Sequence, residues 1–246
     1  MLLTENPITA SAKTLTTRTK FAKYLFVVSG TTGNYANPAA ILTALDSSKI
    51  KLEKQLQNAV QRINDRPLTD IIEIATQIQG EVKGYITGGR SYLEFTIEIA
   101  NGGCARVSEK NYFTLALSAL PANLETNVFA MDSVLDAGTE LSYDTVKVFS
   151  ESSGFNQCSS ASLIAVPKAS IKRLELRLPS GQSVIYEPAE LSRMCDELNE
   201  SAYNLSGVKS SGARNFYILP IDAYSEFKAD VTADATVYLV KHVIAQ

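Results

Sequence analysis

The sequence predicts an all-β protein built from two tandem eight-stranded jelly rolls, each with one short inserted helix. Three observations lead to this prediction. Segments that alternate in polarity, or that are rich in β-branched and aromatic residues, recur along the chain between turn residues. The two halves of the chain also match each other, as shown by Ile50 and Ile171, which are 121 residues apart. A repeat of this size is domain-sized, and two-sheet sandwiches of eight strands are typically jelly rolls.

The first half contains clear strand patterns. Residues 21–30, FAKYLFVVSG, are β-branched and aromatic, and residues 111–120, NYFTLALSAL, form a second such run after a glycine turn. Residues 91–100, SYLEFTIEIA, alternate between an apolar and a polar face, which is typical of a half-buried strand. The apolar face carries Leu93, Phe95, Ile97 and Ile99, and the polar face carries Glu94, Thr96 and Glu98.

The second half contains a longer series of strand patterns. They lie at residues 141–150, 162–167, 170–178, 182–187, 215–224, 226–232 and 235–243. The turn between the third and fourth of them, LPSGQ, combines proline, serine and glycine. This spacing of short strands and turns is typical of a sandwich.

Two helices are predicted, each after a proline. In PAELSRMCDELN, the apolar residues fall on one helical face: Leu191, Met194, Cys195 and Leu198. Pro188 suits the first turn, where its missing N–H would have no helical partner. In PLTDIIEIATQIQ, the corresponding residues follow Pro67: Leu68, Ile71, Ile72, Ala75 and Ile78.

The helices belong to the clearest part of the repeat. The segments 50–75 and 171–199 both begin with Ile-Lys, and a proline follows 17 positions after the isoleucine in each. Both segments predict strand, turn, strand and helix. Extending the alignment without a gap pairs Val27 with Val148 and Gly33 with Gly154. We interpret the pattern as an internal duplication.

The predicted organisation is an N-terminal arm over residues 1–20, a first jelly roll over 21–130 and a second over 131–246. Residues 121–140 are expected to link the two. The arm is rich in Thr, Ser and Lys without a clear period, and it lacks the apolar core of a signal peptide. No segment approaches the 18 or so apolar residues of a membrane-spanning helix. The arm's cations, Lys13, Arg18, Lys20 and Lys23, could meet anionic lipid headgroups or remain solvated.

Composition and charge argue against several classes of function. The chain has 246 residues, 23 basic and 26 acidic, and a net charge of −3. It shows no basic stripe, so direct binding of nucleic acid is not expected. Its three cysteines form no CxxC pair, which argues against a zinc knuckle or a thioredoxin-type site. Cys195 is expected to be a small core residue.

Catalytic and metal-binding patterns are missing from the sequence. The only histidine, His242, is expected on a strand surface near the end of the chain, and a histidine triad or zinc site needs more partners. The glycine-rich stretch 29–35 lacks the lysine of a P-loop and is expected to join strands. No catalytic, cofactor-binding or metal-binding residue is therefore predicted.

Two acidic groups leave alternatives open. Glu94 and Glu98 share a strand face with Thr96 and could form a carboxylate pair for glycoside hydrolysis, although alternating glutamates usually keep a strand face soluble. Four further acids form no EF-hand-type loop but could hold a surface Ca²⁺ between loops or subunits. These acids are Asp222, Glu226, Asp230 and Asp234.

The chain resembles the double jelly-roll major capsid proteins of tailless, membrane-containing bacterial viruses, particularly the small corticovirus-like members. The resemblance rests on residues 23–32 with 49–75 in the first half and on 167–198 in the second, where a strand pair leads into a short helix. It covers nearly the whole chain from about residue 20. It is a likeness of pattern, length and duplication rather than of an invariant motif.

The resemblance implies a structural protein and no enzyme. Three subunits of two jelly rolls would form a pseudo-hexameric capsomer of an icosahedral shell, with the chain found in the virion and in the host cytoplasm during assembly. The implied partners are other copies of the chain, neighbouring capsomers, minor capsid or penton proteins, and the internal viral membrane through the arm. The alternatives are a soluble lectin-like or adhesin-like tandem sandwich with clustered tyrosines, a minor capsid or spike protein, and a hydrolytic enzyme.

Overall fold

The computed structural model of the chain describes residues 1–56, 58–78, 81–101, 103–133, 138–151, 154–199 and 215–244, without the side chains of 196–199. Strands account for 54% of the residues and helices for 12%, which confirms the all-β class. The chain divides into two compact units. The first contains Met1–Leu141 together with residues 243–244, and the second contains residues 142–199 and 215–242. The first unit thus ends later than residue 130, where the first jelly roll is expected to end.

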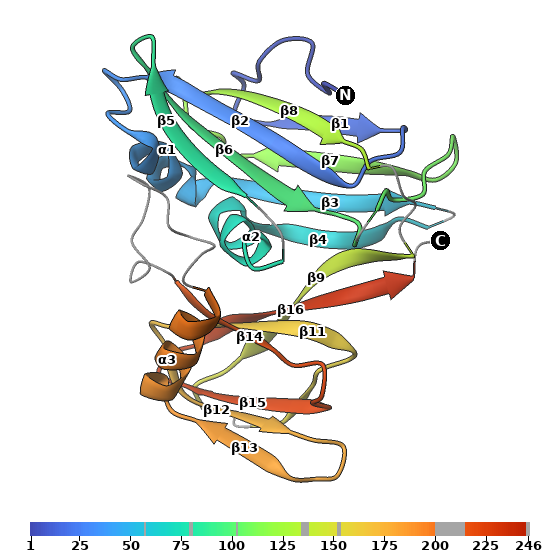
Figure 1. Ribbon diagram of the computed structural model, residues 1–246, viewed down its shortest axis with the longest axis vertical. Helices are drawn as coiled ribbons and strands as arrows, with labels where there is room; N and C mark the ends of the chain where they lie inside the picture. The colour runs from blue at the N-terminus through green and yellow to red at the C-terminus, as the bar shows by residue number, and fades with distance from the viewer. Residues whose placement is uncertain are drawn as a thin grey trace. The chain divides into compact units, whose positions relative to one another are not determined.

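The first unit contains two layers of strands (Figure 1). One layer is the sheet β5-β6-β2-β8, and in the other the strands pair in the order β1-β7-β3-β4. All neighbouring strands within these two layers pair antiparallel. The strand bounds are β1 Lys13–Thr17, β2 Lys23–Thr31, β3 Lys49–Gln55, β4 Val60–Pro67, β5 Val82–Thr87, β6 Arg90–Glu98, β7 Tyr112–Ser118 and β8 Glu125–Met131.

Three short helical segments accompany these strands. They are α1 Pro38–Ala44, the 3-10 turn η1 Leu45–Ser47 and α2 Leu68–Ala75. Asn37 caps α1 by accepting a hydrogen bond from the N–H of Ala40. Helix α2 begins directly after Pro67, as predicted, but its residues are buried on nearly all sides rather than on one face. The reason is that α2 contacts both β4 and β6, which belong to different layers.

The core of the first unit is rich in aromatic side chains. Phe21 packs against Tyr24 and Phe113 with ring centroids 4.7 and 5.2 Å apart, and Phe26 stacks on Phe95 at 4.7 Å. All five rings are buried. Such ring contacts add about 0.5–1.5 kcal/mol each beyond the burial of apolar area. The four apolar residues predicted to share one face of β6 are also buried, which confirms that prediction.

Two expectations for the first unit require correction. Residues 1–20 do not project as an arm, because β1 pairs with β7 and the backbone of residues 1–8 pairs with the outer edge of β8. The expected linker 121–140 contains β8, a strand of the first unit whose Val128 is fully buried. Burial alternates along β8, but polarity does not, because its apolar residues are the consecutive run 128–131. The alternation that predicts a half-buried strand is therefore missing from the sequence. Residues 134–137 of the expected linker lie outside the described residues.

The second unit also contains two layers (Figure 1). Its strands pair in the orders β9-β16-β11-β14 and β10-β15-β12-β13. The bounds are β9 Thr139–Val148, β10 Asn156–Gln157, β11 Ala161–Pro167, β12 Ile171–Arg177, β13 Ser183–Tyr186, α3 Pro188–Asn199, β14 Phe216–Pro220, β15 Glu226–Val231 and β16 Ala235–Ile244. Each predicted strand of this half overlaps one of these strands, and the two-residue strand β10 was not predicted.

The core of the second unit is mainly aliphatic. Leu174, Leu176 and Phe227 from one layer face Ile164 and Leu239 from the other in a single buried cluster. Helix α3 adds its predicted face to this cluster: Leu191 and Cys195 are buried and Met194 is partly buried, whereas the side chain of Leu198 lies outside the described residues.

The order of elements agrees with the internal repeat in one part and disagrees in another. Strand β3 with β4 and α2 corresponds in order to β12 with β13 and α3, which agrees with the pairing of Ile50 with Ile171. The pairing of Val27 with Val148 does not agree with the order of elements. Val27 lies in β2, which is the third strand-like segment of its unit, whereas Val148 lies in the first strand of the second unit. The insertion of α1 between β2 and β3 explains why an ungapped alignment fails there.

Candidate functional site

The described residues hold no group of three or more His, Cys, Asp or Glu side chains placed to bind a metal ion. His242 lies exposed on β16, as predicted. All three cysteines are buried thiols. Burial raises the pKa of Cys158 to about 11, with a smaller contribution from the charge of Glu226, so this thiol is protonated and a poor nucleophile at neutral pH.

The four acids proposed for a surface Ca²⁺ do not converge. Glu226 binds Arg177 at 3.1 Å, Asp230 binds Arg173 at 2.8 Å, and Asp234 accepts hydrogen bonds from the backbone and side chain of Ser150. These carboxylates therefore serve as partners of cations and N–H groups within the second unit. Asp222 is exposed in the turn after β14.

The pair Glu94 and Glu98 also fails as a hydrolytic site. Four residues along a strand span about 13 Å, whereas acid and base carboxyls of glycosidases lie about 5–9.5 Å apart. Glu98 is buried and forms an ion pair with Lys23 at 3.2 Å. Burial raises the pKa of Glu98, and Lys23 opposes this shift.

The outward face of the sheet β5-β6-β2-β8 gathers the best candidate binding groups. The rings of Tyr85 on β5 and Tyr92 on β6 stack nearly parallel across the strands, with centroids 4.9 Å apart and planes 8° apart. Tyr85 is 40% exposed, and its hydroxyl donates a hydrogen bond of 2.7 Å to Glu94. This bond raises the pKa of Tyr85 to about 12, so the phenol remains a hydrogen-bond donor at neutral pH.

A hollow of about 200 Å³ lies beside this tyrosine pair on the same sheet. Four charged side chains surround the hollow: Lys23, Glu81, Lys83 and Glu94. The rest of the lining comes from Leu25, Phe95, Thr96 and Met131. Lys83 binds Glu81 at 2.7 Å, which lowers the pKa of Glu81 and raises that of Lys83. Thr96 accepts a hydrogen bond from the N–H of Glu81 and fixes the start of β5 over β6.

The sequence holds a signal for this site that the sequence analysis missed. Gly88 and Gly89 both have positive φ, 56° and 72°, as a two-residue hairpin turn with both central residues left-handed requires. Such a turn fixes the register, so Tyr85 must lie opposite Tyr92 and Lys83 opposite Glu94. The Gly-Gly pair between two apolar runs is a recognised hairpin pattern.

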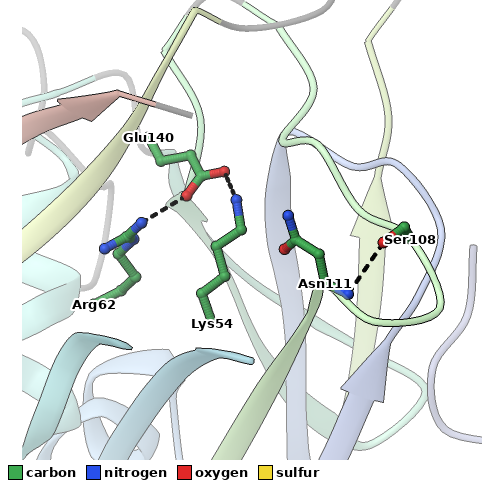
Figure 2. A network of polar contacts seen from close by, with 5 residues as sticks. All are labelled: Lys54, Arg62, Ser108, Asn111 and Glu140. Carbon is green, nitrogen blue, oxygen red and sulfur yellow. Dashed lines mark hydrogen bonds and ion pairs between the residues drawn. The ribbon is translucent and has the colours of Figure 1, made fainter. Parts of the chain in front are cut away.

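A second polar cluster lies inside the first unit (Figure 2). Glu140, at the start of β9, accepts hydrogen bonds from Lys54 on β3 and, at 3.0 Å, from Arg62 on β4. Lys54 and Glu140 are completely buried, and Arg62 is 6% exposed. The ammonium of Lys54 also lies 5.4 Å from the ring centre of Phe113. These contacts hold the cluster on three strands, so we interpret it as structural.

Two of the cations of residues 13–23, Arg18 and Lys23, have partners within the first unit. The guanidinium of Arg18 lies 4.6 Å from the ring centre of Tyr112, and Lys23 binds Glu98. Lys13 is an exposed residue of β1. Among the described helices, none has the length and apolarity needed to cross a membrane. A contact between these cations and anionic lipid headgroups remains a prediction.

The sequence matches no family model and no curated protein. The function therefore has to be argued from the strand connectivity and from the surfaces described above.

Proposed function

We propose that both units are jelly rolls and that the chain is a major capsid protein. In a jelly roll, eight strands lettered B to I along the chain form two sheets in the orders B-I-D-G and C-H-E-F. In the second unit, lettering β9 to β16 from B to I turns the observed orders into B-I-D-G and C-H-E-F without exception. This agreement is the single observation that carries the proposal.

The first unit supports the same assignment with two additions. Residues 1–8 take the place of strand B, because Leu2 and Ile8 form bridges to β8. Strands β1, β2, β3, β4, β6, β7 and β8 then take the places of C to I. The orders again become B-I-D-G and C-H-E-F, with β5 as an extra strand at the edge beside G. Helix α1 is the second addition.

The two helices that start after a proline provide independent support. Under this lettering, α2 follows strand F and precedes strand G in the first unit, and α3 occupies the same interval in the second. Two units with the same strand order and the same inserted helix are what duplication of one jelly roll would produce. The sequence repeat between residues 50–67 and 171–188 falls in this stretch, which the two units share.

Such a duplication suits an icosahedral shell. A trimer of two-roll subunits offers six similar corners and can fill lattice positions with six neighbours. We propose that the chain forms this pseudo-hexameric trimer, contacts neighbouring capsomers and minor or penton proteins, and is located in the virion after assembly in the host cytoplasm. In this proposal the N-terminal residues form part of the first unit, and contact with the internal viral membrane is an additional role for them.

The lectin-like or adhesin-like alternative is favoured by one observation, the exposed stack of Tyr85 on Tyr92 beside a hollow. It predicts a monomer or weak dimer in solution. It does not by itself require two units of the same connectivity, and we therefore rank it second.

The test is the mass of the purified full-length chain, measured over a wide concentration range and combined with negative-stain images of the same fraction. Because one chain has a mass of 26.7 kDa, the proposal predicts a stable species of about 80 kDa with a hexagonal outline. A monomer at every concentration, with no larger ordered particles, would overturn it. A compact dimer would also contradict it, since a two-fold pair does not supply six corners.

A further inference from the structure

We propose that the outward face of the sheet β5-β6-β2-β8 is a binding site for a neutral saccharide. The site consists of the Tyr85–Tyr92 stack and the adjoining hollow of about 200 Å³. It lies entirely within the first unit. The inference does not rest on the capsid proposal, because the same face would bind sugar in a monomer or in a trimer.

Tyr85 provides the surface for the apolar face of a sugar ring. Strand β5 is the last strand of its sheet, so the face of the Tyr85 ring turned away from Tyr92 has no neighbouring strand. Tyr92 supports the ring from the other side, and Glu94 holds the hydroxyl. An exposed aromatic ring fixed in this way loses little conformational entropy when a ligand packs on it. It offers a rigid amphipathic contact with a polar edge.

The hollow provides the hydrogen bonds. Two ammonium groups, from Lys23 and Lys83, and two carboxylates, from Glu81 and Glu94, surround it. Hydroxyl groups of a sugar both donate and accept, so they can bond to both kinds of side chain. The charges balance, which gives no preference for an anion or a cation. A neutral polyol fits this lining better than a phosphate or a carboxylate ligand.

The dimensions indicate how much of a saccharide the site can hold. The hollow is smaller than the roughly 300–1,000 Å³ of pockets that enclose drug-sized ligands, so it suits one sugar ring. Tyr85 is two residues along β5 from Lys83, a distance of about 7 Å. A second ring linked to the first would therefore reach the tyrosine. We infer a preference for a disaccharide over either of its monosaccharides.

The experiment uses the full-length protein and saturation-transfer difference NMR with a fixed panel of probes. The panel contains glucose, galactose, mannose and N-acetylglucosamine, together with one disaccharide of each. The proposal predicts transfer to at least one neutral sugar, stronger for its disaccharide. Little change with salt is expected, because no net charge is neutralised on binding. If none of the probes receives saturation, the proposal is wrong.

Three variants locate the binding. Tyr85→Ala should weaken it by at least about tenfold, whereas Tyr85→Phe keeps the ring and should weaken it only a few-fold. Tyr112→Ala is the matched control, because Tyr112 is a partly exposed tyrosine of β7 in the other layer. Circular dichroism checks that each variant keeps its strands. Equal binding by wild type and Tyr85→Ala would overturn the proposal.

Discussion

Under the proposed lettering the two units share a strand order, but they differ in the side chains that fill their cores. The first unit buries aromatic rings together with an ionic cluster, in which two cations share one carboxylate, Glu140. The second unit buries an aliphatic cluster and keeps the ion pairs Arg173–Asp230 and Arg177–Glu226 partly exposed. Two-layer units of this kind are thus compatible with quite different interiors.

The last buried residues of two strands show the difference. Strand β3 buries Ile50, Leu52 and Lys54, whereas the buried series of strand β12 ends with Leu176. The first series ends with an ammonium group and the second with an aliphatic side chain. Desolvating these charges opposes folding, and their mutual attraction offsets this effect only while all three groups remain in place.

The largest effect is expected from Glu140→Gln. The substitution removes the negative charge and leaves Lys54 and Arg62 buried without a counter-ion, so we expect a loss of about 3–5 kcal/mol in the free energy of unfolding. Urea denaturation of the full chain measures it. Asp230→Asn is the matched control, since its partner Arg173 is partly exposed, and its loss should not exceed about 1 kcal/mol. Equal losses would show that the two units tolerate broken ion pairs alike.

Replacing the whole cluster should act in the opposite direction. A triple variant with Lys54→Met, Arg62→Leu and Glu140→Leu removes every buried charge of the cluster at similar side-chain volume. Its stability should be unchanged or raised by about 1–4 kcal/mol, because apolar replacements of buried ion networks are often neutral or favourable. Comparison with Glu140→Gln in the same urea experiment tests this. If the triple variant is as unstable as the single one, the cluster contributes more than paired charge.

A close approach in the first unit gives the next effect. Gly30 has no room for a side chain, since an added Cβ would lie 2.3 Å from Cδ2 of Tyr35. The Tyr35 hydroxyl donates to the carbonyl of Ala122 at 2.8 Å, so the ring cannot move without loss. Gly30→Ala should therefore cost about 1–3 kcal/mol by overpacking. Gly33→Ala is the control, because a Cβ there meets nothing within 4 Å. Thermal unfolding compares the two; similar midpoints would contradict the packing argument.

The sequence predicted the second unit better than the first, for physical reasons. In the second half, short strands with clear apolar runs lie between marked turns, as in LPSGQ, and each prediction overlaps an observed strand. In the first half, β1 consists largely of threonine and lysine, and β5 contains an internal glycine, Gly84. Their strand structure comes from pairing with β7 and β6 rather than from local preference.

Only the hairpin of β5 and β6 in the candidate site was predictable from the sequence. The Gly88–Gly89 turn determines that Tyr85 meets Tyr92, and this can be deduced from the sequence. The position of Lys23 and Met131 at the same hollow cannot, because it depends on the pairing of β2 with β6 and β8, which are distant in sequence. The cluster of Lys54, Arg62 and Glu140 was missed for the same reason. A charged residue in an alternating strand predicts a solvated face unless its partner is known.

The smallest effect is expected at Glu98, on the sheet face that carries the hollow. A variant at this position tests whether burial or the ion pair with Lys23 has the larger effect on the pKa of Glu98. Burial raises its pKa, so the folded protein holds this proton more tightly than the unfolded chain. The resulting stabilisation is complete below the ordinary pKa of 4.5 and is lost as the pH rises through the raised value.

Glu98→Gln mimics the protonated form. Its stability relative to wild type should therefore increase between about pH 4 and pH 7, as urea denaturation at both values would measure. A relative stability that falls with pH would mean that the pair with Lys23 outweighs burial. The ionised glutamate would then be a stabilising part of that face, as the partly exposed ion pairs are in the second unit.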